Sequence, residues 1–332
     1  MPIKVKSKPD LSPKRIRKFV KPFLVPPGAK VRLPNDFDPA STGGYNREDG
    51  AGAQQILQAG ITLLADYQAR LAAQSTHGVL VILQAMDAAG KDGTIRHVMS
   101  GVNPQGVDVS GFKVPSADEL AHDYLWRYQA KIPARGRIGI FNRSYYEEVL
   151  VVRVHPQLLE TQKLPDGAAG QEGARDGIWQ RRFREINNYE RYLSDNGVRI
   201  VKLFLNLSRE AQRERFVSRI DQPSKNWKFT ASDVRERAFW DAYQAAFSDV
   251  LSNTSTKWAP WYVVPADNKW FSRLVAAAAI GNALLDIDPD YPTASSETKA
   301  SLETARRELE AESRGGKRQG KTKNGKKKAG GR

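Results

Sequence analysis

The sequence has no cysteine, and this absence excludes disulfide bonds, thiolate metal sites and a cysteine nucleophile. Long apolar runs are also missing, because the longest, residues 274–280, is far shorter than the roughly 20 residues that a membrane-spanning helix needs. The basic start MPIKVKSKPDLSPKRIRKF is not followed by an apolar run and therefore does not resemble a signal peptide. We expect a cytoplasmic protein that has no membrane contact.

Acidic residues are scarce at both ends of the chain. The net charge is +15, but residues 1–32 and 314–332 each carry a net +9, which leaves −3 for residues 33–313. A protein whose folded body binds nucleic acid normally carries its basic patch on that body. Nucleic acid binding is therefore expected only through the tails, which can equally hold polyphosphate or an acidic surface, or simply be solvated.

The chain of 332 residues is long enough for one large or two modest domains. Residues 1–50 are rich in proline, lysine and glycine and predict an extended arm over the folded body. Residues 51–290 carry the apolar and helical patterns of that body. From about residue 291 the sequence is weakly helical, and it then becomes a basic, low-complexity tail that we expect to be disordered.

Short apolar runs alternate with helical patterns through the body. The runs expected to be strands are residues 78–84, 107–112, 137–141, 199–207 and 261–264. The helical patterns lie at residues 53–74, 116–130, 178–193, 208–220, 231–252 and 270–286. Strands that are apolar throughout are buried on both faces, and their alternation with helices predicts an α/β fold with a parallel sheet of about five strands between layers of helices.

The strongest functional signal is the run GVLVILQAMDAAGKDGTIRHVM at residues 78–99, where a buried strand leads through small residues into a helix. Backbone N–H groups of such a turn converge on a phosphate, and the Lys91 ammonium neutralises its oxygens. The strict pattern G-x-x-x-x-G-K-[ST] is not matched, because Ala85 replaces the first glycine and Asp92 follows the lysine. An ordinary strand–helix turn with a surface lysine therefore remains an alternative. The residues that we expect to bind phosphate here are Ala88, Ala89, Gly90, Lys91, Asp92, Gly93 and Thr94.

Two features favour a phosphate site over that alternative. Asp87 lies inside the turn, where its charge would repel phosphate unless a Mg²⁺ ion stood between them. The strand at 137–141 is followed by Asn142 and Arg143 and then by Glu147 at the start of a helix. In α/β folds ligand groups lie at the carboxyl ends of strands, and Arg143 there suits bidentate contact with a phosphate.

A second basic segment predicts a lid at about residues 215–235. Arg219, Lys225 and Lys228 fall within ten residues, around a Pro-Ser turn. Such a segment can close over a polyanion and exclude water, although a solvated basic loop has the same composition. Asp233 is expected either to pair with these cations or to bind metal. The four histidines show no metal spacing and no paired acid, so none is expected to be catalytic.

The run AMDAAGKDGTIRHVMSGVNPQGVDVSGFKVPS, with DYLWR at 123–127 and FNRSYYEEVLVVRVHP at 141–156, resembles the polyphosphate kinase type 2 family. The similarity continues through EINNYER, VKLFLNLS, RIDQPSKNWKFTASD and TKWAPWYVVPADNKW, and it covers roughly residues 55–288. It implies a thymidylate-kinase-like, three-layer P-loop fold over residues 51–290, Mg²⁺ dependence and a homo-oligomer. Asn142 and Glu147 stand where other subgroups have FDRSW, and FNRSYYE resembles the subgroup that accepts both AMP and ADP.

Phosphoryl transfer requires mainly positioning and charge neutralisation, and with the resemblance this sorts the residues into roles. Lys91 and the backbone of residues 88–93 would hold polyphosphate near the transferred group. Asp87 would bind Mg²⁺ and orient the acceptor phosphate. Arg127 and Arg143 would neutralise the donor and acceptor phosphates.

The remaining roles concern the nucleotide. Glu147 would compensate for the charge that Asn142 lacks relative to aspartate. Phe112 and Lys113 would contact the nucleotide, which only the resemblance suggests. Asp233 is the second residue that we expect to bind metal.

We therefore expect a polyphosphate-dependent nucleotide kinase that transfers a phosphoryl group reversibly from inorganic polyphosphate to ADP, AMP or both. An ATP-dependent nucleoside monophosphate kinase on the same fold is an alternative, and it would need a base pocket beside the P-loop instead of a long cationic channel. A third possibility, from another class, is a non-enzymatic protein that binds RNA or polyphosphate through its basic tails.

Overall fold

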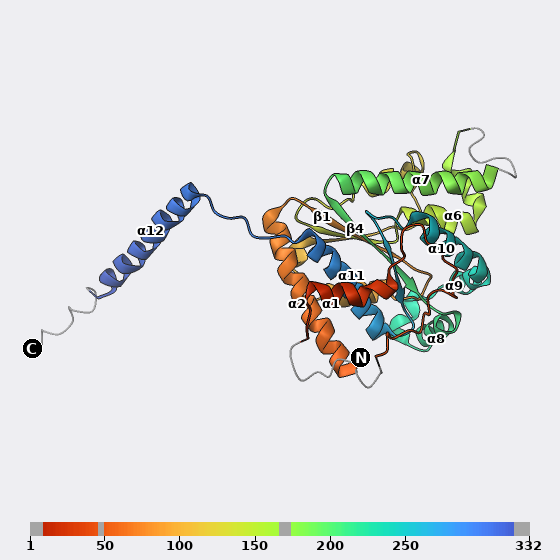
Figure 1. The fold of residues 1–332 in the computed structure, drawn as a ribbon, viewed down its shortest axis with the longest axis horizontal. Helices are drawn as coiled ribbons and strands as arrows, with labels where there is room; N and C mark the ends of the chain where they lie inside the picture. The colour runs from red at the N-terminus through yellow and green to blue at the C-terminus, as the bar shows by residue number, and fades with distance from the viewer. Residues whose placement is uncertain (1–8, 46–49, 166–173, 322–332) are drawn as a thin grey trace, which may run out of the picture. The chain divides into compact units, whose positions relative to one another are not determined.

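Within the described residues, five strands form one parallel sheet in the order β2-β3-β1-β4-β5 (Figure 1). The computed structural model describes residues 9–45, 50–165 and 174–321. The strands are β1 Gly78–Gln84, β2 Val107–Gly111, β3 Ile138–Asn142, β4 Val198–Asn206 and β5 Trp261–Pro265. Each lies within one residue of its expected bounds, so the five predicted strands and the α/β class are confirmed.

Helices cover both faces of the sheet. The long ones in this unit are α2 Gly50–Gln74, α7 Ala174–Asp195, α8 Arg209–Ile220, α10 Trp240–Thr254 and α11 Lys269–Ile287. In Figure 1, α2 and α11 lie on one side of the sheet and α7 lies on the other. The short helix α3, Lys91–Val98, follows β1 directly, so the expected P-loop opens onto a helix N-terminus.

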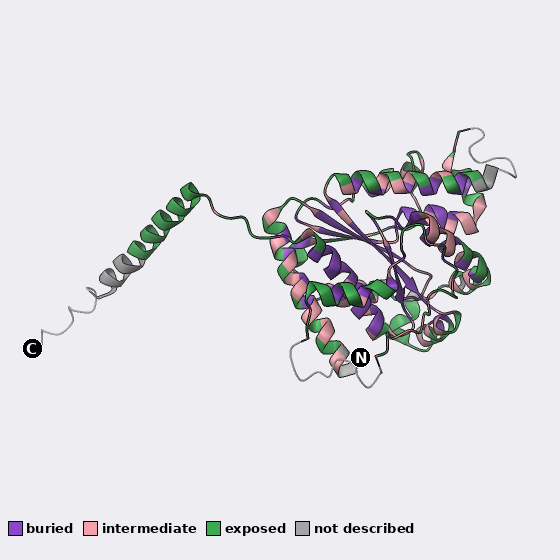
Figure 2. Ribbon diagram, viewed as in Figure 1, coloured by how far each residue is buried: buried purple, intermediate pink, exposed green. Residues whose placement is uncertain are grey.

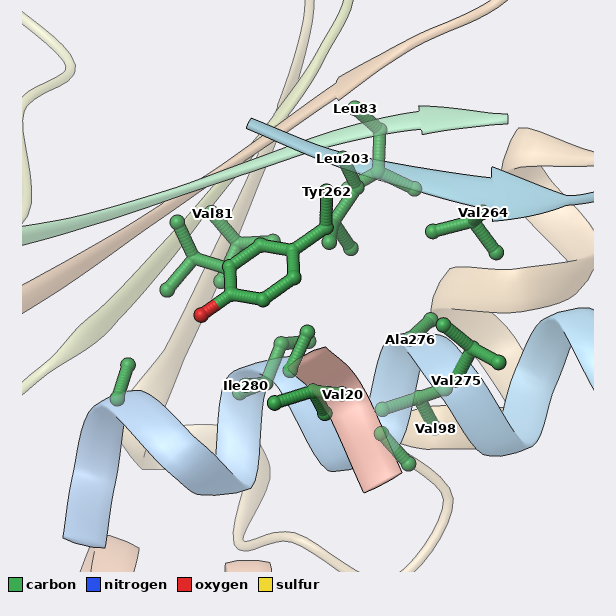
Figure 3. Packing of buried hydrophobic residues seen from close by; sticks show 14 of the residues in the cluster. Val20, Val81, Leu83, Val98, Leu203, Tyr262, Val264, Val275, Ala276 and Ile280 are labelled. Carbon is green, nitrogen blue, oxygen red and sulfur yellow. The ribbon is translucent and has the colours of Figure 1, made fainter. Parts of the chain in front are cut away.

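The core consists of two apolar layers separated by the sheet (Figure 2). Successive residues of a strand point to opposite faces. Val81 therefore packs toward α11, whereas Leu80 packs toward α7 and α10. Figure 3 shows the first layer, in which Tyr262 of β5 lies over Ile280 of α11. Because both faces are covered, the strands consist almost entirely of apolar residues.

The helix α11 is long and apolar enough to cross a membrane by length and composition. In the structure, 72% of its apolar 18-residue window is buried. It packs against α2, β4 and β5, and this position in the core accounts for its composition.

The N-terminal arm differs from the extended segment that we expected, because residues Pro13–Val20 form the helix α1. The proline occupies the first turn, where a missing N–H costs nothing. Ile16 and Val20, four residues apart, are buried on one face of this helix. The ring of Phe19 packs edge-on against Phe271 of α11, with 6.1 Å between the ring centroids. The helical spacing of these apolar residues therefore determines the local structure, although the proline- and lysine-rich composition predicted an extended segment.

Two expected helices are interrupted. Residues 116–130 form the short helices α4, Ala117–Leu120, and α5, Trp126–Gln129. Residues 231–252 are divided into α9 Ala231–Glu236, a 3₁₀ turn Arg237–Phe239 and α10. The segment expected to be a lid, about residues 215–235, consists of the end of α8, the 3₁₀ turn Pro223–Lys228 and α9.

The second compact unit is Tyr291–Arg332. It contains α12, Ser296–Lys321, so the helical part of the tail extends to residue 321. Residues 296–312 are exposed, and Arg306 pairs with Glu310 one turn later (2.9 Å). Residues 322–332 lie outside the described residues, and the disorder predicted there stays a prediction.

Candidate active site

The turn between β1 and α3 has the backbone shape of a phosphate-binding loop. Ala88 (φ +64°) and Gly90 (φ +103°) both adopt the left-handed conformation. Such turns direct successive N–H groups toward one side, where an anion binds. The side chain of Lys91 folds back over the turn, and its Nζ donates to the carbonyl oxygen of Ala85 (3.0 Å). The ammonium group therefore lies at the mouth of the turn.

Charged side chains surround this ammonium group. Burial lowers the pKa of Lys91, and the neighbouring Arg143 lowers it further, whereas the carboxylates of Asp87, Glu147 and Asp92 oppose both effects. Burial also raises the pKa of Glu147, which Arg143 and Lys91 counteract. The site thus contains cations and carboxylates that stabilise one another in a partly desolvated environment.

Arg143 connects the turn to the end of β3. Its guanidinium pairs with Asp87 Oδ1 (3.0 Å) and Glu147 Oε2 (3.5 Å). Asn142 Nδ2 donates to Asp92 Oδ1 (2.9 Å), which adds a second connection between β3 and α3. The structure therefore brings together all five residues for which the sequence predicted a catalytic role, and these are Asp87, Lys91, Asn142, Arg143 and Glu147.

The segment after Arg143 is anchored by a buried polar network. Arg143 itself has a left-handed backbone (φ +68°), which costs a non-glycine residue roughly 1–3 kcal/mol and persists where its surroundings hold it. The hydroxyl groups of Tyr145 and Tyr146 both donate to Glu190 Oε1 (2.9 Å each). Lys202 Nζ donates to Glu190 Oε2 (2.6 Å) and to the hydroxyl of Tyr146 (2.8 Å).

This network was not predicted. Burial raises the pKa of Glu190 and lowers that of Lys202, and each partner opposes the shift of the other. Removing one member of such a buried pair leaves an uncompensated charge, which costs about 3–5 kcal/mol. The network therefore fixes the turn that carries Arg143 and Glu147.

A cationic cavity of about 960 Å³ extends from the P-loop along α8 to the start of α11. Among the residues that the structure describes, its cationic lining consists of Arg96, Arg215, Arg219, Lys225, Lys269 and Arg273. Asp92, Glu214 and Asp267 also line it. Burial lowers the pKa of Lys269, and so do the charges of Arg215, Lys225, Arg273 and Arg219. This mutual repulsion is relieved when an anion occupies the cavity.

Two further cavities are lined by residues of the P-loop and by Arg143. One, of about 630 Å³, is lined by residues 87–93, Phe112, Lys113, Asn142, Arg143, Arg219 and Asp233. The other, of about 160 Å³, is lined in part by Asp87, Arg143, Glu147, His155, Asp233, Glu236 and Tyr243. The two share Asp87, Arg143 and Asp233, so any group bound at Arg143 is reached from both.

Residues 47–291 match the family model described as Polyphosphate kinase 2 (PPK2). The chain belongs to the polyphosphate kinase 2 family. It is 47% identical to the ADP-polyphosphate phosphotransferase of Rhodopseudomonas palustris over 292 residues, covering 87% of this chain and 98% of that one. It is 42% identical to the AMP/ADP-polyphosphate phosphotransferase of Meiothermus ruber over 276 residues, covering 82% and 96% respectively.

Solved structures of the family resemble the fold. The crystal structure of polyphosphate kinase 2 from Arthrobacter aurescens superposes with a TM-score of 0.73 at 37% identity, covering 86% of this chain and 98% of that one. Family membership and this likeness confirm the expected P-loop kinase fold and the phosphotransferase class.

Arg127, which the resemblance to polyphosphate kinase 2 predicted to contact phosphate, lies away from the P-loop. The side chain of Arg127 is 9% exposed and pairs with Glu119 (3.2 Å). Its Nη2 donates to the carbonyl oxygen of Lys113 (3.0 Å), and its guanidinium lies 5.3 Å from the ring of Phe112. Arg127 lines a separate cavity and supports the 112–113 segment, and the phosphate contact expected of it stays a prediction.

Phe112 is likewise largely a core residue. It is 8% exposed, and its ring centroid lies 4.4 Å from that of Tyr128 and 4.9 Å from that of Phe141. Lys113 follows it at the edge of the 630 Å³ cavity. Of this pair, Lys113 is therefore better placed to reach a nucleotide.

The lid residues have mixed placements. Arg219 and Lys225 line the cationic cavity, as expected for a lid over a polyanion. The carboxylate of Asp233 accepts a hydrogen bond from the hydroxyl of Thr230 (2.9 Å) and caps α9, although it also faces both cavities at Arg143. The side chain of Lys228 lies outside the part of the chain that the structure describes.

His155 has an acid partner that the sequence did not reveal. Its Nε2 lies 3.0 Å from Glu236 Oε2, and the Tyr243 hydroxyl donates to the same oxygen (3.0 Å). Because 81 residues separate His155 from Glu236, only the folded chain brings them together. The expectation that no histidine has a paired acid was therefore wrong.

Oxygen ligands for Mg²⁺ are present at the P-loop. Mg²⁺ usually keeps several waters and binds one or two carboxylates together with substrate phosphates. The described residues contain no group of three or more side chains arranged as a complete metal site. The carboxylate of Asp87, 36% exposed, and that of Asp92 both line the cavity beside the phosphate-binding turn. These residues therefore fit an ion that is held jointly with phosphate.

Proposed function

We propose that this protein transfers a phosphoryl group reversibly between inorganic polyphosphate and ADP or AMP. The observation that carries the proposal is the cationic cavity, which begins at the P-loop and continues past Arg219 to Lys269 and Arg273. A chain of phosphates carries a negative charge on every unit, so a row of cations suits it better than it suits one nucleotide. The names of the Rhodopseudomonas and Meiothermus relatives support both ADP and AMP as acceptors.

In this proposal the donor occupies the cationic cavity and the acceptor occupies the cavities at Arg143, and the P-loop lines both regions. Polyphosphate in the cationic cavity would place its terminal phosphate at the turn's N–H groups and at Lys91. The nucleotide's terminal phosphate would bind at Arg143. One of its oxygens attacks the terminal phosphorus of polyphosphate, and the bridging P–O bond breaks, so that the shortened polyphosphate leaves as an anion. The acceptor is already anionic and needs no general base.

The fit of the oxygen ligands supports Mg²⁺ as the cofactor, with Asp87 as its principal protein ligand. Bound there, Mg²⁺ would neutralise charge on the reacting phosphates. We also propose, from the family resemblance, that the protein is a homo-oligomer, and, from the sequence pattern, that it works in the cytoplasm.

The decisive experiment compares donors. Purified protein is incubated with Mg²⁺ and AMP or ADP, and either polyphosphate or ATP is the sole donor. We expect phosphorylated nucleotide from polyphosphate and little transfer from ATP to AMP. Equal or faster transfer from ATP would favour a nucleoside monophosphate kinase, and no transfer from either donor would favour a binding protein. The Lys91→Ala variant, prepared in parallel, controls for contaminating kinases.

The basic tail is expected to affect binding of long polyphosphate more than turnover. The candidate catalytic residues all lie between residues 87 and 147, whereas residues 314–332 carry +9. Truncation after residue 290 should therefore leave kcat on short polyphosphate nearly unchanged. It should weaken binding of long chains at low salt, because a cationic tail attracts polyanions by a force that salt screens. A folded, truncated protein that loses turnover on short chains would place the tail in the active site.

A further inference from the structure

Side chains of one helix, α8, bond the carbonyl groups of three successive P-loop residues. Gln212 Nε2 donates to the carbonyl oxygen of Asp87 (2.9 Å). Arg215 Nη1 donates to the carbonyl oxygens of Ala88 (3.1 Å) and Ala89 (2.8 Å). Gln212 and Arg215 are three residues apart and therefore lie on the same face of α8. The helix thus fixes the direction of three peptide groups in the turn.

The other terminal nitrogen of Arg215 holds a different segment. Its Nη2 donates to the carbonyl oxygens of Ala266 and Asp267, the latter at 3.1 Å. A guanidinium has four N–H donors on its two terminal nitrogens and one on Nε. In the described contacts, the four terminal donors face four backbone carbonyl oxygens. Although Arg215 lines the cationic cavity, only its Nε–H is left for a phosphate.

The segment at residues 266–267 is itself firmly held. Asp267 accepts a hydrogen bond from the backbone N–H of Ser208 (2.8 Å), and its own N–H donates to the carbonyl oxygen of Pro39 in the N-terminal arm (3.1 Å). The N–H of Ala266 donates to the carbonyl oxygen of Asn206 at the end of β4 (2.9 Å). The guanidinium therefore attaches the P-loop to a part of the body that is fixed from three directions.

The P-loop needs such an attachment because of its own sequence. Ala88 stands in the left-handed conformation, which a residue with a Cβ disfavours. In a trans peptide the carbonyl and the following N–H point in opposite directions. The N–H of Ala89 is used within the turn, where it donates to the carbonyl oxygen of Met86 (3.3 Å). The carbonyl groups of Asp87 and Ala89, held toward α8, therefore turn the N–H groups of Ala88 and Gly90 toward the side on which phosphate binds. Without the hydrogen bonds from Gln212 and Arg215, which together we call the clamp, the turn would relax to conformations in which these N–H donors no longer converge.

We propose that Arg215, together with Gln212, is a positioning residue that holds the P-loop backbone in its phosphate-binding conformation and is not a ligand of polyphosphate. The inference rests on the proposed function, in which the P-loop binds the terminal phosphate. It separates Arg215 from Arg219, which lies one turn further along the same helix and lines the same cavity.

The test compares Arg215→Lys with Arg219→Lys, the same substitution one turn apart. A lysine keeps the charge but cannot reach four carbonyl groups. For Arg215→Lys we expect kcat to fall about tenfold or more with short and long polyphosphate alike, while KM for polyphosphate changes less than about threefold. Hydrogen–deuterium exchange of the peptide spanning residues 85–94, measured without substrate, should become faster. Arg219→Lys should instead raise KM and leave that exchange unchanged.

Two results would overturn the proposal. In one, Arg215→Lys raises KM with unchanged kcat and unchanged exchange, as expected for a phosphate ligand. In the other, none of the three quantities changes. Should Arg215→Lys fail to fold, Gln212→Leu, which removes the bond to Asp87 without a change of charge, decides by the same measurements. A wild-type protein inactive with polyphosphate would contradict the proposed function, whereas the exchange measurement tests the clamp independently of substrate.

Discussion

Replacing Lys91 with alanine is expected to lower kcat about 10²-fold or more while the protein remains folded. The ammonium group lies at the mouth of the P-loop, 3.0 Å from the carbonyl oxygen of Ala85. A preorganised charge of this kind contributes most when negative charge develops in the transition state, and removing one such donor costs about 10²–10³ in rate. Lys91 is partly buried, so the lost charge is not replaced by a neighbouring mobile cation.

The measurement is the initial rate of nucleotide phosphorylation at saturating polyphosphate, with thermal unfolding as the check on the fold. Lys131→Ala provides the control, because Lys131 is an exposed lysine outside the cavities at the P-loop. It should retain full activity. A stable Lys91→Ala protein with more than half of the wild-type rate would contradict the P-loop assignment.

The sheet was predictable because its strands are buried on both faces. Residues such as Val79, Leu80 and Val81 are all fully buried, so the apolar run has no polar interruption that would blur its ends. The helix α1 was missed for the opposite reason. Its basic residues and its proline dominate the composition, and two buried positions, Ile16 and Val20, are too few to stand out in the sequence.

The site was predictable where it is contiguous in the sequence. Asp87 and Lys91 lie in one turn, and Arg143 and Glu147 lie in another. That the two turns meet follows from the sheet order, in which β3 is hydrogen-bonded beside β1 and Leu83 is paired with Asn142. The order of strands in a parallel sheet is not encoded in any local pattern. The proximity of these two turns was therefore predicted only through the family resemblance.

Arg219 of α8 was predicted from its basic segment, but the contributions of Gln212 and Arg215 of α8 and of the start of α11 could not be found in this way. β4 lies on the other side of β1, and it therefore delivers Gln212 and Arg215 to the P-loop backbone from the opposite direction. Lys269 and Arg273, one turn apart at the start of α11, reach the same cavity from the end of β5. An arginine inside a charged helix such as REAQRERFVSRI gives no sign that its guanidinium faces inward.

Removal of divalent metal is expected to abolish transfer, and Asp87→Asn is expected to lower kcat about 10²-fold. Without substrate, Asp87 and Glu147 balance the charge of Arg143, at 3.0 Å and 3.5 Å respectively. A phosphate bound at Arg143 takes over that pairing and repels both carboxylates. A divalent cation at Asp87 converts the repulsion into attraction, because it is shared between carboxylate and phosphate. Asparagine keeps the shape and an oxygen but not the charge.

A role of Asp87 in metal binding can be separated from a role in the transfer step itself. Mg²⁺ is titrated into wild-type and variant protein after treatment with EDTA, and the rate is measured at each concentration. If Asp87 holds the metal, Asp87→Asn should need a higher Mg²⁺ concentration for half-maximal rate as well as giving a lower maximum. Asp108→Asn is the matched control, since Asp108 also pairs with an arginine, Arg137 (2.5 Å), but on the edge strand β2 outside these cavities. Its rate and metal dependence should equal those of the wild type. Full activity of the metal-free protein would contradict a metal-binding role for Asp87. The function of Asp87 would then be limited to its ion pair with Arg143.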